Sequence, residues 1–537
     1  MPHGDAHNLT EPSRVWSRQA LVVLAIVVVV GIALGWASRG AALTLDGDDS
    51  IALTLSRSIA AGHYRDEFLV GAPPHAQYPP GFPFWLLLVR LAIGGSLDAI
   101  LAANLLLITV AVIFMADAVR QLSGPWLAVT AAAVVMFNPP LFVLAAELRS
   151  EILFLALCSL ALWLSLVDAN RSKSWYAVFA ISASIAAFLT RSAGIAMLPA
   201  IGWALLLQRK WWPLLAGGVV AAAVVISWFT YTLWAGQHTI GHTYAADFVA
   251  VVPASEPGRF LAHALSNAKV YFARLAERQF GIPDIPNSPL DNLILGLSLA
   301  IPAAVGARML ARRWPALVLF LALSVAILLV YPWPISRLFV PLTPWLAVMI
   351  LIGCTGIAAG FRRRYGPQIA IGVGVVLAGI GLVGRVDAVR RAYGCRASAP
   401  FVDPRCYKEQ YRSYVAAVRF IRDSLPTNAI VAAAKPSFVF ETTHRLTVPL
   451  ELFAQTNAAR LLAPQGPATT ILLSRLLPYE VDLVTPRLRA QCLSLSALAR
   501  FSAGTIVLGV RDAADTRSNA CELLDAQARD ASGIREN

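Results

Sequence analysis

Apolar runs of about 20 residues recur between residues 18 and 385, and no other feature restricts the possible folds of this chain as strongly. Each run is long enough to cross about 30 Å of hydrocarbon as a helix. A content of 57% hydrophobic and only 14% charged residues is far from that of a soluble globular chain. The sequence therefore predicts a polytopic α-helical membrane protein.

The apolar runs predict about eleven transmembrane helices. These are expected at residues 18–37, 97–119, 125–145, 151–168, 175–190, 193–207, 213–235, 290–307, 315–331, 338–359 and 367–385. Arg and Lys gather in short loops between these segments, near residues 171–173, 209–210, 308–313 and 362–364. Cytoplasmic loops are enriched in Lys and Arg, so we assign these loops and residues 1–17 to the cytoplasm. The formal charge of +13 then reflects orientation, and no nucleic-acid partner is predicted.

This topology leaves two long external loops, 38–96 and 236–289. In the first loop, segment 82–93 ("FPFWLLLVRLAI") is short for a crossing, and counting it as a span would invert every later loop. Its Trp85 suits headgroup depth, so we expect the segment to lie in the membrane interface, where it can form a wall for an isoprenoid chain.

The second loop carries His238, His242 and Tyr244. Two histidines four residues apart can bind a metal only if they lie on a regular helix, and the neighbouring Gly236 and Gly241 argue against one. We therefore interpret this loop as a cover for the site instead of a metal centre.

Residues 386–537 are mixed and polar, unlike the segment before them. A helical pattern in "YRSYVAAVRFIRDSLP" is followed by a short strand pattern in "AIVAAA" and by apolar runs in "ATTILLSRLL" and "GTIVLGV". These patterns predict a C-terminal α/β domain of about 150 residues. The charge rule makes this domain extracytoplasmic, and the outer face of a bacterial inner membrane is the expected location.

The C-terminal region holds four of the six cysteines, and an even number outside the cytosol predicts disulfides. Four cysteines permit three sets of pairings, of which Cys395–Cys406 with Cys492–Cys521 is one, and the sequence does not choose among them. Cys158 and Cys354 lie within predicted spans and are expected to be packing residues.

Acidic residues stand directly after the first apolar run, in "LTLDGDDSIALTLSRSIAAGHY". Ile51, Leu55 and Ile59 repeat every four residues, which predicts an amphipathic helix with Asp48 or Asp49 as its N-cap. A cap alone would explain these acids. However, the topology places further charged residues at the same membrane face. They are Glu147, Arg149 and Glu151 in "AELRSE", Arg191, and Arg337 in "YPWPISR".

Charges so close to spans are costly unless they are paired or face a wet cavity. The guanidinium of Arg suits a phosphate, because it can donate two parallel hydrogen bonds. Acids and arginines on one rim therefore predict a site for an anionic headgroup. The simpler reading of each arginine is an ion pair or a side chain that extends to the interface.

The stretch "GDDSIALTLSRSIAAGHY…GAPPHAQYPPGFPFWLLL" resembles the first external loop of the GT-C glycosyltransferases. These polytopic enzymes use polyprenyl-phosphate sugars and include protein mannosyltransferases and the aminoarabinose transferases of lipid A. The shared features are an acid after the first helix, a short helix ending in Gly-x-Tyr, and a Tyr-Pro-Pro-Gly-Phe-Pro element. "SEILFLALCSLALWL" and "SRLFVPLTPWL" are similar to later parts of the same family, so the resemblance covers roughly residues 20–385.

The resemblance implies a role for each matching residue. Asp48 corresponds to the catalytic acid, with Asp49 as a one-residue alternative, and Glu151 corresponds to a second external carboxylate. Arg337 corresponds to a basic residue near the lipid phosphate, and Tyr78, in the Pro-Pro element beside the site, is also expected to contact the donor phosphate. Ala52 stands where many members have tyrosine, and Tyr78 stands where some have a basic residue, which leaves the sugar and the acceptor open.

The resulting prediction is an inverting glycosyltransferase that moves a sugar from a polyprenyl phosphate to a cell-envelope glycan, lipid or protein. Asp48 would act as general base, while Arg337 and Arg191 would offset the charge on the departing phosphate. Glu151 would orient the base or help to hold a divalent cation, and the sequence does not decide whether a cation is used. The alternative is a transporter or flippase for an anionic polyprenyl lipid. Transporters more often carry charge near mid-membrane, whereas these residues lie at helix ends.

Overall fold

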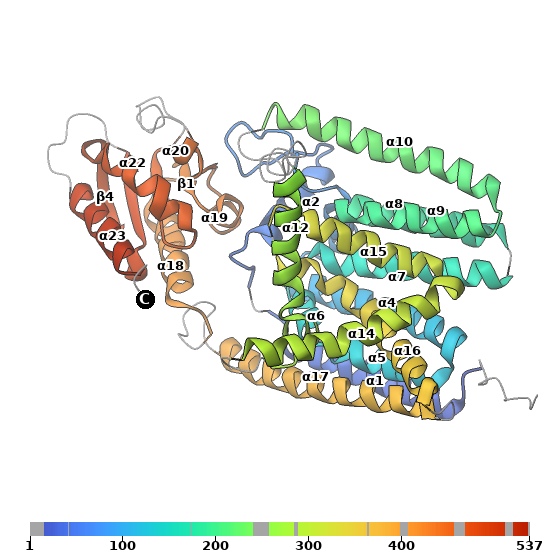
Figure 1. Cartoon of the computed structure of the whole chain (residues 1–537). Helices are drawn as coiled ribbons and strands as arrows, with labels where there is room; N and C mark the ends of the chain where they lie inside the picture. Colours follow the sequence, from blue (N-terminus) through green and yellow to red (C-terminus); the bar gives the residue numbers. More distant parts are fainter. Residues whose placement is uncertain are drawn as a thin grey trace, which may run out of the picture.

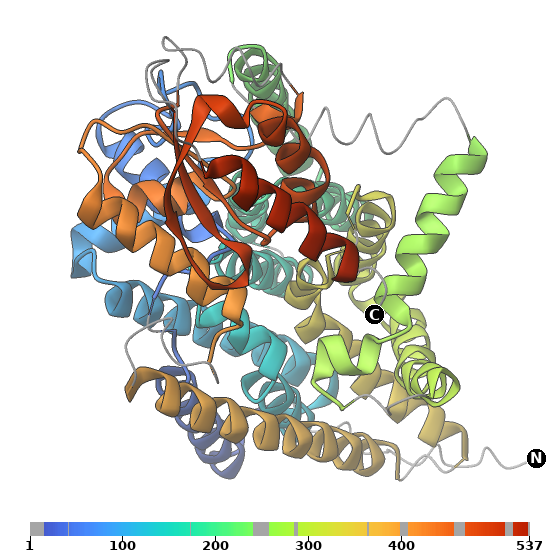
Figure 2. The ribbon, with the colours of Figure 1, turned by 90° about the vertical axis from the view of Figure 1, so that its left-hand side faces the viewer.

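The computed structural model describes residues 15–40, 42–171, 173–239, 257–283, 288–333, 335–361, 365–397, 406–455, 468–510 and 519–534. Long helices run side by side in one direction, and a smaller unit that contains a β-sheet lies at one end of this bundle (Figure 1). Viewed from that end, the smaller unit covers part of the bundle (Figure 2). The site described below lies between the two.

Seven helices of the described residues are long and apolar enough to cross a membrane. They are α1 (Arg18–Ala37), α4 (Leu97–Ser123), α7 (Ser150–Arg171), α10 (Trp211–Gly236), α14 (Pro289–Arg313), α16 (Thr343–Phe361) and α17 (Gly366–Ala397). The pair α5 (Pro125–Met136) and α6 (Pro139–Ala145) is bent by 59° and meets the same criterion if taken as one span. The polytopic helical fold is thus confirmed.

Four shorter apolar segments complete the bundle. They are α3 (Gly81–Ile93), α8 (Ser174–Thr190), α15 (Pro315–Val330), and the 3-10 turn η1 (Ser192–Ala196) continued by α9 (Met197–Leu207). Every predicted span coincides with a helix or helix pair. The number of crossings stays a prediction, because three of the expected spans are these shorter helices.

Helices α14 and α16 pack backbone to backbone through glycines. A Cβ atom at Gly306 would lie 1.9 Å from the carbonyl oxygen of Met349, and one at Gly353 would lie 1.8 Å from that of Pro302. Small residues allow such close approach of membrane helices. The contact holds α16 in place directly after the 3-10 turn η2 (Ser336–Leu338), which carries Arg337.

Helix α2 (Asp48–Ala60) begins at Gly47, whose φ of 89° favours glycine. No side chain caps this helix, so the predicted cap by Asp48 or Asp49 is wrong. Both acids instead occupy its first turn, where carboxylates interact favourably with the helix dipole. Helix α3 packs on α2 and leaves Phe84, Leu88 and Leu91 exposed.

The smaller unit is built on a five-stranded mixed sheet with strand order β2-β1-β3-β5-β4. The strands are β1 (Val431–Ala433), β2 (Thr447–Pro449), β3 (Thr470–Leu473), β4 (Leu495–Arg500) and β5 (Ile506–Val510). Strand β1 pairs in parallel with β2 and β3, and β5 pairs antiparallel with β3 and β4. The predicted helix coincides with α18 (Glu409–Ser424), and disulfides join Cys395 to Cys406 and Cys492 to Cys521.

This C-terminal unit contacts the segment between α1 and α3 at several points. Phe68 accepts hydrogen bonds at its carbonyl from the backbone N–H (2.9 Å) and hydroxyl (2.7 Å) of Thr447. Ser437 of α19 (Pro436–Thr443) donates to the carbonyl of Gly47 at 3.1 Å. Farther along α2, Arg57 pairs with Glu441. Contacts with the C-terminal unit therefore help to fix the position of the start of α2.

The segment predicted as a long covering loop contains helices α12 (Pro257–Phe272) and α13 (Leu275–Phe280). His238 lies just after α10 and contacts the carbonyl of Trp234 through Nδ1 at 2.8 Å. His242 and Tyr244 lie outside the described residues. The proposed cover over the site stays a prediction.

Candidate active site

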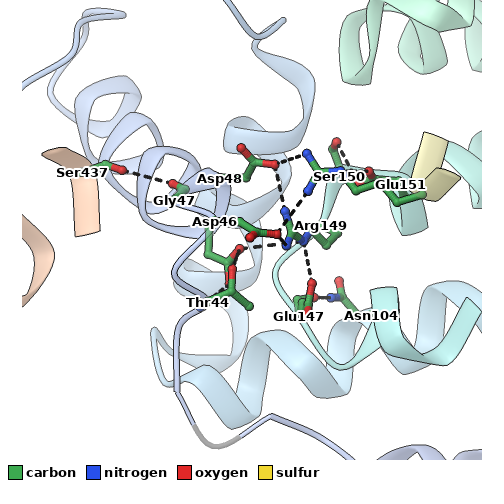
Figure 3. Close-up of polar contacts among 12 residues, drawn as sticks. Thr44, Asp46, Gly47, Asp48, Asn104, Glu147, Arg149, Ser150, Glu151 and Ser437 are labelled. Atoms are coloured by element: carbon green, nitrogen blue, oxygen red, sulfur yellow. Dashed lines mark hydrogen bonds and ion pairs between the residues drawn. The ribbon is translucent and has the colours of Figure 1, made fainter. Parts of the chain in front are cut away.

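Charged side chains from four parts of the chain meet at the end of the bundle beside the C-terminal unit (Figure 3). We call them the acid–arginine cluster. Its members are Asp46, Asp48, Asp49, Glu147, Arg149, Glu151, Arg191 and Arg337. Five carboxylates and three guanidinium groups give a formal charge of −2, so the ion pairs leave negative charge in excess.

Arg149 lies at the centre of the cluster and is only 3% exposed. Its Nη2 lies 2.6 Å from Asp46 Oδ2, its Nη1 2.8 Å from Asp48 Oδ2, and its Nε 2.7 Å from Glu147 Oε2. Burial opposes its charge, but the surrounding carboxylates, Glu147 first, raise its pKa above the ordinary value. Arg149 is thus a fixed cation whose hydrogen bonds are used within the protein.

Asp48 is contacted by Arg149, Arg337 and Tyr78. Its Oδ2 lies 2.5 Å from Arg337 Nη2, in addition to the contact with Arg149. Its Oδ1 accepts the hydroxyl hydrogen bond of Tyr78 at 2.9 Å. Burial favours the neutral acid, but Arg337 and Arg149 outweigh it and hold the pKa of Asp48 below its usual value. With its side chain 25% exposed, Asp48 is an ionised carboxylate that remains accessible.

Asp49 has a different environment although it is the next residue. It is 1% exposed, and its two oxygens accept hydrogen bonds from the backbone N–H (3.0 Å) and hydroxyl (2.8 Å) of Thr44. Burial raises its pKa to about 6. Its carboxylate therefore fastens the segment before α2 and is closed to a substrate.

Glu151 and the two outer arginines form the second half of the cluster. Glu151 Oε1 lies 2.9 Å from Arg191 Nη1 and 4.0 Å from Arg337 Nε. Arg191 also donates to Ser150 Oγ at 2.8 Å. Arg337 thus stands between Asp48 and Glu151 with 29% of its side chain exposed, and its Nε makes no hydrogen bond to any described residue. The structure brings together all six residues selected from the sequence; their roles stay predictions.

Residues not selected from the sequence hold Tyr78 in place. Buried His75 contacts Asp66 Oδ1 through Nδ1 at 2.7 Å, and its Nε2 accepts the backbone N–H of Tyr78 at 2.8 Å. The network assigns the proton to Nδ1, because Nε2 must accept. Tyr64 donates its hydroxyl to the carbonyl of Tyr78 at 2.8 Å. The histidine in "PPHAQYPP" was the available signal for this arrangement.

Metal ligands are not grouped in the part of the chain that the structure describes. No set of three or more His, Cys, Asp or Glu side chains there is arranged to hold an ion. The carboxylates of the cluster instead have arginine partners.

Comparisons with known proteins agree with this architecture. Residues 77–231 match the family model described as dolichyl-phosphate-mannose-protein mannosyltransferase. The fold is similar to that of ArnT from Cupriavidus metallidurans in the apo state, with a TM-score of 0.55 and 14% identity over 91% of this chain and 98% of that one. The same protein bound to undecaprenyl phosphate gives a TM-score of 0.51 and 15% identity over 94% and 100%.

A third similar structure is the oligosaccharyltransferase of Archaeoglobus fulgidus in complex with Zn and sulfate. It has a TM-score of 0.52 and 13% identity over 84% of this chain and 67% of that chain. No curated protein matches the chain in a sequence search. The family model thus covers less than a third of the chain, and these solved structures share its fold.

Proposed function

We propose that this protein transfers a sugar from a polyprenyl-phosphate donor to a cell-envelope acceptor, with Asp48 as the general base. The observation that carries the proposal is the position of Asp48 beside Arg337, with Glu151 on the other side of that arginine. This provides an accessible carboxylate and, next to it, a cation with an uncommitted N–H group. An acceptor proton and a leaving phosphate need these two groups.

The reaction would proceed by direct displacement at the sugar. The acceptor oxygen or nitrogen attacks C1, its proton passes to the Asp48 carboxylate, and the bond between C1 and the phosphate oxygen breaks with its electrons on that oxygen. The configuration at C1 inverts, because attack is opposite the leaving group. Arg337 and Arg191 offset the charge that develops on the phosphate.

Arg337 also links donor binding to the strength of the base. In the free protein, two guanidinium groups lower the pKa of Asp48, which makes it a weak proton acceptor. A donor phosphate that draws Arg337 toward itself removes one of these cations from Asp48. The pKa of Asp48 then rises, so the base becomes stronger when the donor is bound.

The proposed topology has the N-terminus and the basic loops in the cytoplasm and the C-terminal unit outside, across a bacterial inner membrane. About eleven crossings separate residues 1–17 from the external region 386–537. Two observations support this orientation: the basic segments 209–210 and 308–313 lie at the end of the bundle away from the sheet, and two disulfides lie in or beside the C-terminal unit.

The decisive experiment supplies radiolabelled polyprenyl-phosphate sugars to the purified protein in detergent and measures sugar transfer or release. We expect the wild type to consume the donor and Asp48→Asn to lose this activity while keeping its thermal stability. Full activity of Asp48→Asn would exclude the carboxylate as base. Binding of the donor without any consumption by the wild type would favour the flippase alternative.

A further inference from the structure

The C-terminal end of α15 is held by two polar side chains of α12. Asn267, which is 1% exposed, donates from Nδ2 to the carbonyl groups of Leu329 (3.0 Å) and Tyr331 (2.8 Å). His263 Nε2 lies 2.9 Å from the same carbonyl oxygen of Tyr331, so this nitrogen carries the proton and donates it. The last carbonyl groups of a helix lack partners within the helix. Asn267 and His263 therefore cap α15 from the side.

These polar residues of α12 face the protein, and apolar residues face away from it. His263, Asn267 and Tyr271 are four positions apart and share one face of the helix. Tyr271 is 2% exposed, whereas Leu261 and Leu265 are 60% and 61% exposed. Helix α12 stands across the direction of the long helices, at the end of the bundle beside the C-terminal unit (Figure 1). Burying polar groups is costly unless they are hydrogen-bonded, so this face is built for its contacts with α15.

Helix α12 also packs against the chain on the far side of Arg337. The ring centroid of buried Phe339 lies 6.1 Å from that of Tyr271 and 6.5 Å from that of Phe272. Phe339 directly follows η2, the turn that carries Arg337. Between Tyr331 and Phe339 the described chain forms only short turns. Contacts with α12 thus fix this irregular segment before and after Arg337.

We propose that His263 and Asn267 are positioning residues, which set where Arg337 stands relative to Asp48. Nη2 of Arg337 lies 2.5 Å from Oδ2 of Asp48, so a small shift of segment 331–339 would separate these two groups. Through this segment, α12 determines how closely the guanidinium approaches the carboxylate. It also determines where the guanidinium meets the donor phosphate, and this second effect rests on the proposed function.

The test compares the full-length protein in detergent with variants of α12. Asn267→Leu and His263→Leu remove the donated hydrogen bonds, whereas His263→Gln keeps an N–H donor at this position. Ser266→Leu is the control, because it places the same side chain on the exposed face of α12, next to Asn267. His263 is only partly buried, so His263→Leu provides the result if Asn267→Leu does not fold.

The first readout is the titration of Asp48, followed by infrared spectroscopy as the carboxyl band that Asp48→Asn removes. Burial opposes the charge of Asp48, and Arg337 contributes most to lowering its pKa in spite of this. Displacement of Arg337 should therefore raise the pH at which the band disappears. We expect this rise in Asn267→Leu and His263→Leu. We expect none in His263→Gln or Ser266→Leu. The measurement needs no donor.

The second readout is the KM for a polyprenyl-phosphate sugar. We expect both leucine variants of His263 and Asn267 to raise it about threefold or more, because a small displacement of a binding group weakens its contribution strongly. In an Arg337→Gln background, the same two changes should have no further effect on the KM. Changes that act through one shared group are not additive.

Two results would overturn the proposal. One is an unchanged titration of Asp48 in both leucine variants, whatever their thermal stability, because His263 and Asn267 would then have a structural role alone. The other is an equal rise of the donor KM with and without Arg337, because the effect would then act elsewhere. A shifted titration of Asp48 together with a wild type that consumes no donor would refute the transfer reaction and still support the positioning of Arg337.

Discussion

The hydroxyl group of Tyr78, which lies just before α3, donates a hydrogen bond of 2.9 Å to Oδ1 of Asp48, the first residue of α2. This contact leaves Oδ2 to the two arginines and restricts rotation of the carboxylate. The position of Tyr78 is itself set by His75, which accepts its backbone N–H. The orientation of Asp48 therefore depends on the Tyr-Pro-Pro element.

Tyr78→Phe is expected to lower kcat for sugar transfer about tenfold with little change in the KM for the donor. A hydrogen bond to a charged group contributes about 1.5–3 kcal/mol, and its loss lets the carboxylate turn away from the acceptor. Steady-state kinetics measure the effect, with Tyr393→Phe as control because Tyr393 is 78% exposed. Unchanged kcat in Tyr78→Phe would contradict a positioning role.

Replacing Arg337 should impair use of the donor and leave the fold intact. We expect Arg337→Lys to raise the donor KM about tenfold, because an ammonium group cannot form the paired hydrogen bonds of a guanidinium. The side chain of Arg337 is 29% exposed, so the thermal unfolding temperature should change little. The KM is measured at saturating acceptor, and a normal donor KM would argue against phosphate binding by Arg337.

In contrast to Arg337→Lys, Arg149→Gln should mainly lower the thermal stability of the protein. This change leaves Asp46, Asp48 and Glu147 without their shared buried cation, and breaking a buried ion pair costs about 3–5 kcal/mol. Thermal unfolding in detergent should show a large loss of stability. Arg391→Gln is the control, since the exposed pair of Arg391 with Asp387 is expected to contribute less than about 1 kcal/mol. Similar stability of both variants would show that Arg149 is not the structural centre of the cluster.

Asp49 should make stability depend on pH. Its pKa is about 6 in the folded protein against 3.8 for an ordinary aspartate, so the folded state holds the proton more tightly than the unfolded state. The stabilisation is complete below about pH 4 and is lost as the pH rises to about 6. Asp49→Asn carries no titrating proton there and should flatten this part of the profile. Thermal unfolding from pH 4 to 7 makes the comparison, and parallel profiles for the two proteins would exclude Asp49 as the source.

Much of the bundle could be predicted because the length of an apolar run directly limits what a membrane helix can be. The break between α5 and α6 was missed, and segment 125–145 was expected to be a single helix. Asn138 caps α6 by accepting the N–H of Leu141, and two prolines follow it. Proline cannot continue the hydrogen bonds of a preceding helix, so this Asn-Pro-Pro sequence was a readable signal.

The cluster was predicted only in outline. Charges at the ends of spans indicated a common rim, but adjacent residues of a helix point in different directions, and pattern alone did not separate Asp48 from Asp49. That distinction depends on Thr44 and on Arg337, which lies 289 positions from Asp48. Ion-pair partners at such separations follow from packing. For the same reason the contacts of the C-terminal unit with Gly47 and Phe68 could not be anticipated.

The hydrogen bonds that Ser437 and Thr447 donate to the segment around Asp48 also have a consequence for biosynthesis of the protein. The ribosome synthesises the helix bundle before residues 437 and 447, so Asp48 gains these supports only when the final quarter of the chain is made. A chain that stops after α17 would lack these contacts. On the proposed mechanism, such an incomplete chain is expected to be inactive.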